Sequence, residues 1–293
     1  MKLMMVVAAS ACAVSLSATA AESNENTTEA TEAEETSLFS FGADLDFFSA
    51  YVWRNAVQND EMVMQPCVWA DFNALDPLTL GFFIWQNYDL TDARRAVSKH
   101  ALAETDYNLH ASCAAWKSED EALSLDLELG HDWYTYQGVR GDEKSGYPDT
   151  RELYVKATFA NPVADVYGQA SWMYDDFGEY KAGLYYELGL KREFEVAEMV
   201  TVGADWNVGF GDSRYTNYLF GEDSYGFGGT TLKLYSSWQL TDWLALKGTI
   251  AYTGVLNGDI RDAMDEDGLD YDFYGDKYPR DILWGGLSLN VEF

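Results

Sequence analysis

From Leu38 onward, apolar and polar residues alternate one by one in segments longer than most strands of soluble proteins. Residues 123–130 alternate leucine with polar or small residues, and residues 200–210 repeat this pattern with Val, Ala, Trp and Phe. A period of two places one kind of side chain on each face of a β-strand. The pattern predicts twelve strands, over residues 38–54, 61–73, 78–88, 102–116, 122–136, 151–160, 164–175, 181–194, 199–211, 230–240, 243–256 and 281–293.

The predicted connections alternate between short and long, and only the link near residues 177–180 is a short member of the long set. Short turns on one side and long loops on the other are typical of outer-membrane barrels. A soluble sandwich or closed barrel also has alternating strands, but it gives no reason for long loops on one side alone. We therefore expect an all-β fold, an antiparallel up-and-down transmembrane β-barrel of twelve strands over residues 38–293.

In such a barrel the apolar faces point to lipid and the polar faces point inward, because hydrocarbon satisfies no polar group. Aromatic residues then fall near the strand ends, as in the two interfacial girdles of membrane barrels. The loop-side girdle is predicted to hold Tyr51, Trp53, Trp133, Trp172, Tyr174 and Trp206. The turn-side girdle is predicted to hold Phe39, Phe72, Phe159, Trp238, Trp243 and Phe293.

The first residues have the pattern of an export signal. Met1-Lys2 is followed by an apolar stretch and by Ala18-Thr19-Ala20, which predicts a signal peptide over residues 1–20 that is cleaved on export to the bacterial outer membrane. Residues 21–37 are rich in Glu and lack large apolar side chains before Leu38, so we expect a disordered acidic segment there.

Charge and cysteine content narrow the function further. The chain has 49 acidic and 19 basic residues and a formal charge of −30, which excludes a generic nucleic-acid binder. Its 20 Tyr, 15 Phe and 10 Trp exclude a chain that is disordered throughout. Cys67 and Cys113 fall on opposite strand faces and on strands that are not neighbours, so we expect both thiols to be free.

The opening strands carry a short motif. Residues 49–54 read Ser-Ala-Tyr-Val-Trp-Arg, and Gln65-Pro66 and a strand with Gly81 and Trp85 follow. Over residues 49–88 this order resembles the opening hairpin of an uncharacterised, porin-like family of bacterial exported barrel proteins, in which Gly usually stands at the position of Asn55. The resemblance implies the fold and the location, and it implies no activity. Phe293 at the chain end resembles the terminus of chains that the barrel-assembly machinery inserts.

The parity of the alternation assigns side chains to the lumen. The predicted acidic wall comes from the first five strands and comprises Asp44, Asp46, Glu104, Asp106, Asp126, Glu128 and Asp132. The predicted basic residues are Arg54, Lys156, Lys181, Lys191, Lys233 and Lys247. In an open lumen such segregation creates a transverse field and favours cations or zwitterions. In a closed one these groups form salt bridges, and twelve strands lie between the sizes that side chains fill and those that leave a channel.

Two functions follow from these alternatives. The first is a passive, monomeric channel for small hydrophilic solutes, which requires no cofactor and contacts the lipid bilayer and lipopolysaccharide. The second is a closed barrel that acts as a structural, adhesive or receptor protein through the loops 212–229 and 257–280. In the first of these loops, aromatic residues are predicted to stack a sugar, fold into the mouth or pack on one another: Tyr215, Tyr218, Phe220, Tyr225 and Phe227.

The sequence contains no pattern that predicts a catalytic site, and only a weak one that predicts a metal site. A lipid-modifying enzyme needs Ser and His together on the lipid-facing side, and His131 has that parity without a neighbouring outward Ser, so we expect no enzyme. Asp265, Asp267 and Asp270 form a weak candidate for a divalent-cation site, but they miss the EF-hand spacing, and a hydrated acidic loop explains them more simply.

Overall fold

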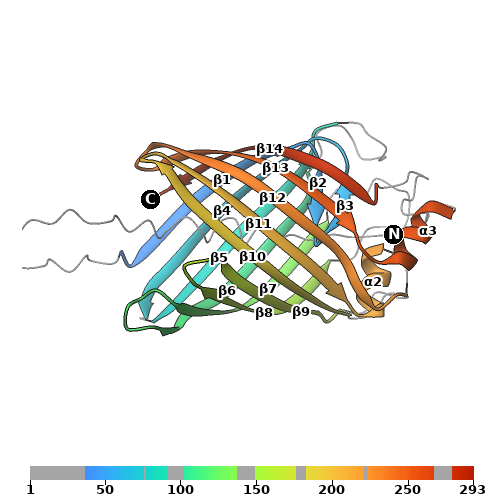
Figure 1. The fold of residues 1–293 in the computed structure, drawn as a ribbon, viewed down its shortest axis with the longest axis horizontal. Helices are drawn as coiled ribbons and strands as arrows, with labels where there is room; N and C mark the ends of the chain where they lie inside the picture. The colour runs from blue at the N-terminus through green and yellow to red at the C-terminus, as the bar shows by residue number, and fades with distance from the viewer. Residues whose placement is uncertain are drawn as a thin grey trace, which may run out of the picture.

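The computed structural model describes residues 37–75, 77–91, 102–136, 149–175, 183–220, 223–266 and 279–293. Twelve antiparallel strands form a closed barrel, in which β1 pairs with both β4 and β14 (Figure 1). The predicted fold is therefore confirmed. The barrel strands are β1 (Phe39–Phe48), β4 (Val63–Leu75), β5 (Leu78–Asp89), β6 (Leu102–Lys117), β7 (Ser124–Tyr136), β8 (Thr150–Ala160), β9 (Asp165–Met173), β10 (Gly183–Ala197), β11 (Val200–Gly211), β12 (Gly226–Thr241), β13 (Leu244–Val255) and β14 (Asp281–Glu292).

The predicted first strand, residues 38–54, is wrong beyond Phe48. There the chain leaves the barrel wall, and β2 (Tyr51–Trp53) and β3 (Ala56–Asn59) form a separate hairpin. Arg54 and Asn55 make its two-residue turn, with φ of 45° and 63°. Positive φ at both central residues defines a type I′ turn, which favours Gly or Asn. The Asn at position 55 therefore suits the place where the resembling family has Gly.

The ends of the barrel differ. The short connections β4–β5, β6–β7, β8–β9, β10–β11 and β12–β13 lie at the end that also holds the C-terminus, which we call the turn end (Figure 1). The opposite end, the loop end, carries the helices α2 (Ser213–Phe220) and α3 (Gly258–Glu266). Among the described residues no helix is long and apolar enough to cross a membrane.

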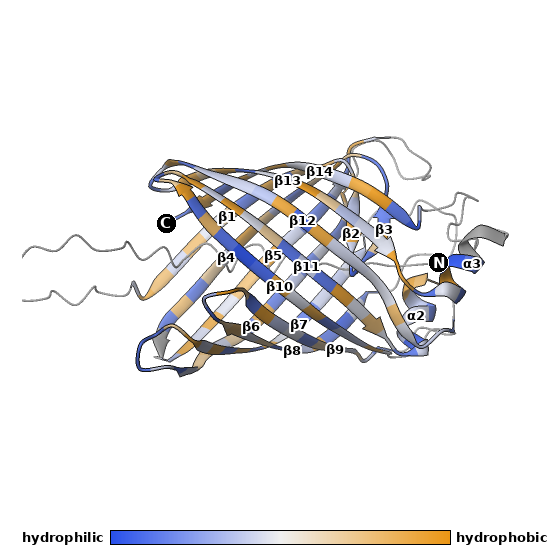
Figure 2. Ribbon diagram, viewed as in Figure 1, coloured by the Kyte–Doolittle hydropathy of each residue, from blue (hydrophilic) through white to orange (hydrophobic). Residues whose placement is uncertain are grey.

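The two faces of the strands differ in chemistry, and hydrophobic and hydrophilic residues alternate along them (Figure 2). Large apolar side chains cover the outer face, where Leu109 is 66% and Leu129 is 61% exposed. A band of this kind matches the lipid-facing surface of a membrane barrel. Trp133, Trp172 and Trp206 are exposed toward the loop end, and Phe39, Trp243 and Phe293 toward the turn end, as predicted for the girdles.

The inner wall repeats a pairing of glycine with tyrosine. Gly130 faces Tyr154, Gly189 faces Tyr167, and Gly203 faces Tyr235 across neighbouring strands. In each pair a Cβ on the glycine would come within 2.4 Å of the tyrosine ring or hydroxyl. The absence of a side chain thus lets each ring lie against the wall. Each hydroxyl then donates to an acidic residue, namely Glu128, Asp205 and Glu193.

We expect Gly203→Ala to lower the free energy of unfolding by about 1–3 kcal/mol, because the new methyl group overpacks the Tyr235 ring. Urea unfolding of the refolded barrel, followed by tryptophan fluorescence, measures the change. Gly248→Ala is the matched control, since its Cβ would lie 3.5 Å from Trp238 in ordinary contact. Equal destabilisation by both variants would contradict the pairing.

Candidate functional site

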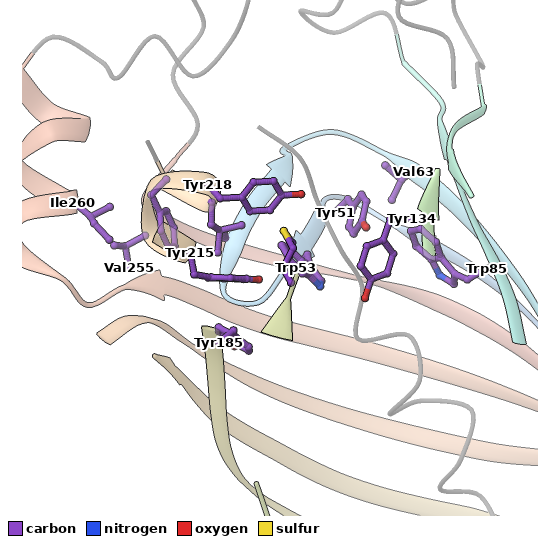
Figure 3. Close-up of a cluster of buried hydrophobic side chains, with 14 of the residues drawn as sticks. Tyr51, Trp53, Val63, Trp85, Tyr134, Tyr185, Tyr215, Tyr218, Val255 and Ile260 are labelled. Atoms are coloured by element: carbon purple, nitrogen blue, oxygen red, sulfur yellow. The ribbon is translucent and has the colours of Figure 1, made fainter. Parts of the chain in front are cut away.

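The β2–β3 hairpin lies inside the loop end of the barrel. Tyr51 is 4%, Trp53 1%, Arg54 5% and Asn55 3% exposed. The rings of Tyr51 and Trp53 belong to a cluster that also includes wall residues Trp85, Tyr134 and Tyr185 (Figure 3). The placement of Tyr51 and Trp53 in the lipid-facing girdle is therefore wrong, because both side chains turn inward with the hairpin.

Polar contacts attach the hairpin to opposite parts of the wall. Tyr51 donates from its hydroxyl to Glu104 on β6 over 3.2 Å, and Asn59 Nδ2 donates to Asp89 at the end of β5 over 2.7 Å. On the other side, the Thr231 hydroxyl on β12 donates to Asn55 Oδ1 over 2.5 Å. The hairpin thus bridges the lumen from β5 and β6 to β12.

Arg54 at the hairpin tip carries the strongest of these contacts. Its Nη1 donates to Glu152 Oε2 over 2.8 Å, and its Nη2 donates to the other carboxylate oxygen. Nη1 also donates to the Tyr215 hydroxyl over 2.6 Å, and Nη2 donates to Ser171 Oγ over 3.2 Å. Both charged side chains are buried, at 1% and 0% exposure. Arg54 was predicted on the wall; it instead reaches the wall from the hairpin, because the chain leaves the barrel before it.

Helix α2 covers the hairpin from the loop end. Asp212 caps it, accepting from the Tyr215 backbone N–H over 2.8 Å. Tyr215, Tyr218 and Phe220 are buried in the same cluster as Trp53. Two of the three alternatives predicted for the loop aromatics are therefore confirmed: these residues fold into the mouth, and the rings of Tyr215 and Tyr218 also pack on one another with centres 6.1 Å apart. Tyr225 and Phe227, in contrast, are 80% and 49% exposed.

The predicted acidic wall divides into two groups. Glu104, Asp106 and Asp132 surround the hairpin and are at most 8% exposed. The other four lie on the inner face and are less buried: Asp44, Asp46, Asp126 and Glu128. Asp132 accepts from Asn108 Nδ2 over 2.6 Å.

Four of the five predicted lysines are among the described residues and lie on the inner face of the wall, three of them on β10, β12 and β13 and one on β8 beside the acidic strand β7. Lys191 and Lys233 both face Asp205 across the strand pairs of β11, and Lys191 Nζ lies 3.0 Å from Glu193. Lys247 Nζ lies 4.2 Å above the Tyr235 ring. Lys156 faces Glu128 across β7 and β8. Lys181 lies outside the described residues.

The lumen therefore has two parts. Its loop end is filled by the hairpin and α2, and its turn-end part is lined by charged side chains that solvent reaches. Asp71 and Glu193 in the latter part are 28% and 37% exposed. Ser171 and Tyr185, which contact the hairpin tip, were not singled out from the sequence. Their position on the polar parity of β9 and β10 places them in the lumen, but nothing local indicates what they bind.

The remaining candidates are isolated. His131 Nε2 lies 2.8 Å from the Tyr174 hydroxyl. Asp265 belongs to α3, and Asp267 and Asp270 lie outside the described residues. In the described part of the chain no three His, Cys, Asp or Glu residues are grouped as metal ligands. Cys67 and Cys113 form no disulfide bond with each other, as predicted.

No protein-family model and no curated protein sequence matches the chain. Among solved structures it is similar to an outer-membrane channel from Pseudomonas putida F1, with a TM-score of 0.52 and 12% identity over 91% of this chain and 100% of that chain. Outer membrane phospholipase A from Escherichia coli gives a TM-score of 0.46 and 13% identity over 85% and 92% of the two chains. At these identities the likeness shows the fold of outer-membrane barrels. The resemblance of residues 49–88 to an uncharacterised family stays a prediction.

Proposed function

We propose that the protein is a porin-like channel of the bacterial outer membrane for small hydrophilic solutes, with a preference for cations, and that the β2–β3 hairpin closes its loop end. The long loops face the outside and the tight turns face the periplasm, as in other outer-membrane barrels. The channel needs no cofactor and is not an enzyme. Lipopolysaccharide and the barrel-assembly machinery are its expected partners in the membrane and during insertion.

The two-part lumen is the observation that supports this proposal. A barrel that serves only as a scaffold has no use for charged inner-face side chains that solvent reaches, whereas a permeation path needs weak polar contacts along its wall. The hairpin is a separate two-stranded sheet that pairs with no barrel strand. It can therefore move without breaking the hydrogen bonds of the wall.

The alternative is a permanently closed barrel that acts through its loops. The burial of Trp53 and its neighbours at the loop end favours this alternative. Single-channel recording of the refolded full chain in a planar bilayer separates the two functions. Discrete opening steps support the channel. A demonstrably folded chain that never conducts, even when the hairpin is shortened, supports the closed barrel.

We expect Asp126→Asn together with Glu128→Gln to reduce the cation preference of the open channel several-fold, because both carboxylates lie on the inner face. The reversal potential in a salt gradient measures the preference. Asp120→Asn is the control: Asp120 lies in the turn between β6 and β7, where the Ser118 hydroxyl lowers the pKa of its carboxyl and keeps it charged. An equal shift from the control would assign selectivity to overall charge.

A further inference from the structure

We propose that the pocket around the Arg54 guanidinium is a binding site for small solutes that carry a guanidinium group, and that Arg54 is its resident occupant. This inference rests on one part of the proposed channel function, namely that a solute can enter the lumen. It assigns a ligand class to the buried loop-end part of the lumen, where the chain's own side chain now occupies the site.

The pocket has the chemistry that distinguishes guanidinium from other cations. A carboxylate that accepts from both terminal nitrogens matches the planar fork of a guanidinium group, which an ammonium ion does not have. Glu152 supplies this contact, and the hydroxyl groups of Ser171 and Tyr215 accept further hydrogen bonds from the same two terminal nitrogens.

Aromatic rings complete the pocket. The guanidinium carbon of Arg54 lies 4.5 Å from the ring centre of Tyr185 and 5.3 Å from that of Tyr215. Ring faces at these distances attract a delocalised cation. Tyr185 lies on β10 and Tyr215 on α2 (Figure 3), and Glu152 and Ser171 lie on the barrel strands β8 and β9. The pocket therefore keeps its recognition groups when the hairpin leaves, and loses only Trp53 and Arg54.

The resident occupant fits the pocket at a cost. Arg54 has φ of 45°, in the left-handed region that disfavours residues with a Cβ. Its buried Nε has no hydrogen-bond partner among the described residues. A free solute with a guanidinium group is not tied to a strained turn and can orient its N–H groups toward the acceptors of the pocket. Such a solute therefore competes with Arg54 for Glu152.

Nearby carboxylates add a second reason to expect a cationic ligand. Asp132 faces Glu152 directly across β7 and β8 and is in electrostatic range of Arg54. Asp106 is 1% exposed and interacts electrostatically with Glu104 and Asp132. Withdrawal of Arg54 leaves this wall without its buried counter-charge. We therefore expect solutes with a net positive charge to bind better than zwitterionic ones.

Titration calorimetry on the folded barrel tests the site with agmatine, which carries a guanidinium and an ammonium group, and with putrescine, which carries two ammonium groups. In a chain whose residues 52–58 are replaced by Asn-Gly, agmatine should bind ~10-fold or more tighter than putrescine. The full chain should bind agmatine more weakly than the shortened chain, because Arg54 occupies the site.

Two variants of the shortened chain keep the test decisive. Glu152→Gln and, separately, Tyr185→Leu should each remove most of the preference for agmatine, whereas Asp120→Asn, in the turn between β6 and β7, should retain it. Equal binding of the two amines, or a preference that survives Glu152→Gln, would overturn the proposal. Calorimetry does not require conduction, so a barrel that binds agmatine but never conducts would refute the channel and leave the site intact.

Discussion

Arg54→Met lowers the free energy of unfolding by about 3–5 kcal/mol, because it leaves the fully buried Glu152 carboxylate without its counter-ion. The expected midpoint shift is read from urea unfolding of the barrel in detergent. Urea is the appropriate denaturant, since guanidinium would itself compete for the vacant pocket.

A double variant separates the buried charge from general packing. Arg54→Met combined with Glu152→Met removes both charges and should recover about 2 kcal/mol or more of the loss. Arg151→Met is the matched control, at the residue next to Glu152 on β8. The Arg151 side chain is 47% exposed, and its Nη1 lies 3.7 Å from Asp175. An ion pair whose basic side chain is half exposed is screened by solvent and contributes about 1 kcal/mol or less. The role of the Arg54–Glu152 pair would be contradicted if Arg151→Met lowered the free energy of unfolding as much as Arg54→Met does. It would also be contradicted if the double variant recovered none of the stability that Arg54→Met loses.

Replacement of residues 52–58 by Asn-Gly raises single-channel conductance at least several-fold over the full chain, which should open only rarely. Tyr51 and Asn59 are partners in the hairpin, so a two-residue type I′ turn can join them without strain. The change removes Trp53 and Arg54 and leaves every barrel strand intact. We expect helix α2 to stay in the mouth, so the increase in conductance measures the contribution of the hairpin alone.

The control for this change keeps the hairpin and alters an exposed loop-end residue. Tyr225→Ser removes an aromatic ring that is 80% exposed beside α2 and should leave the conductance unchanged. If the shortened chain conducts no better than the full chain, another part of the molecule closes the lumen, and the hairpin is not the gate.

The barrel could be predicted from the sequence because its determinants are local. Period-two alternation defines each strand, and turn length defines which strand ends meet. The same parity places Asp132 and Lys233 on the inner face without knowledge of their partners. These features depend on neighbours along the chain or on the adjacent strand, so a single sequence contains them.

The hairpin could not be predicted in the same way. The alternation breaks where the wall ends, because Phe48 is apolar on the parity of Asp44 and Asp46, and Ser49 is polar on the parity of Phe47. A break of one residue is also what a β-bulge produces, so the break alone does not predict a hairpin that leaves the wall. The contacts that hold the hairpin inside are far away in the chain: Arg54 is 98 residues from Glu152 and 161 residues from Tyr215. A second local signal is the pair Arg54-Asn55 between Trp53 and Ala56, which is a weaker type I′ signature than Asn-Gly.

Thiol reactivity at the hairpin tip tests the central claim, that the hairpin fills the loop end of the lumen, most directly. Ser171→Cys, in a chain with Cys67→Ala and Cys113→Ala, places a thiol at a position that is 1% exposed and contacts Arg54. A charged methanethiosulfonate reagent should react with it ~100-fold more slowly in the full-length hairpin than in the chain shortened at residues 52–58. Gln169→Cys, two residues along β9 and less buried, should react readily in both chains. Equally fast reaction of Ser171→Cys in both chains would contradict a lumen closed by the hairpin.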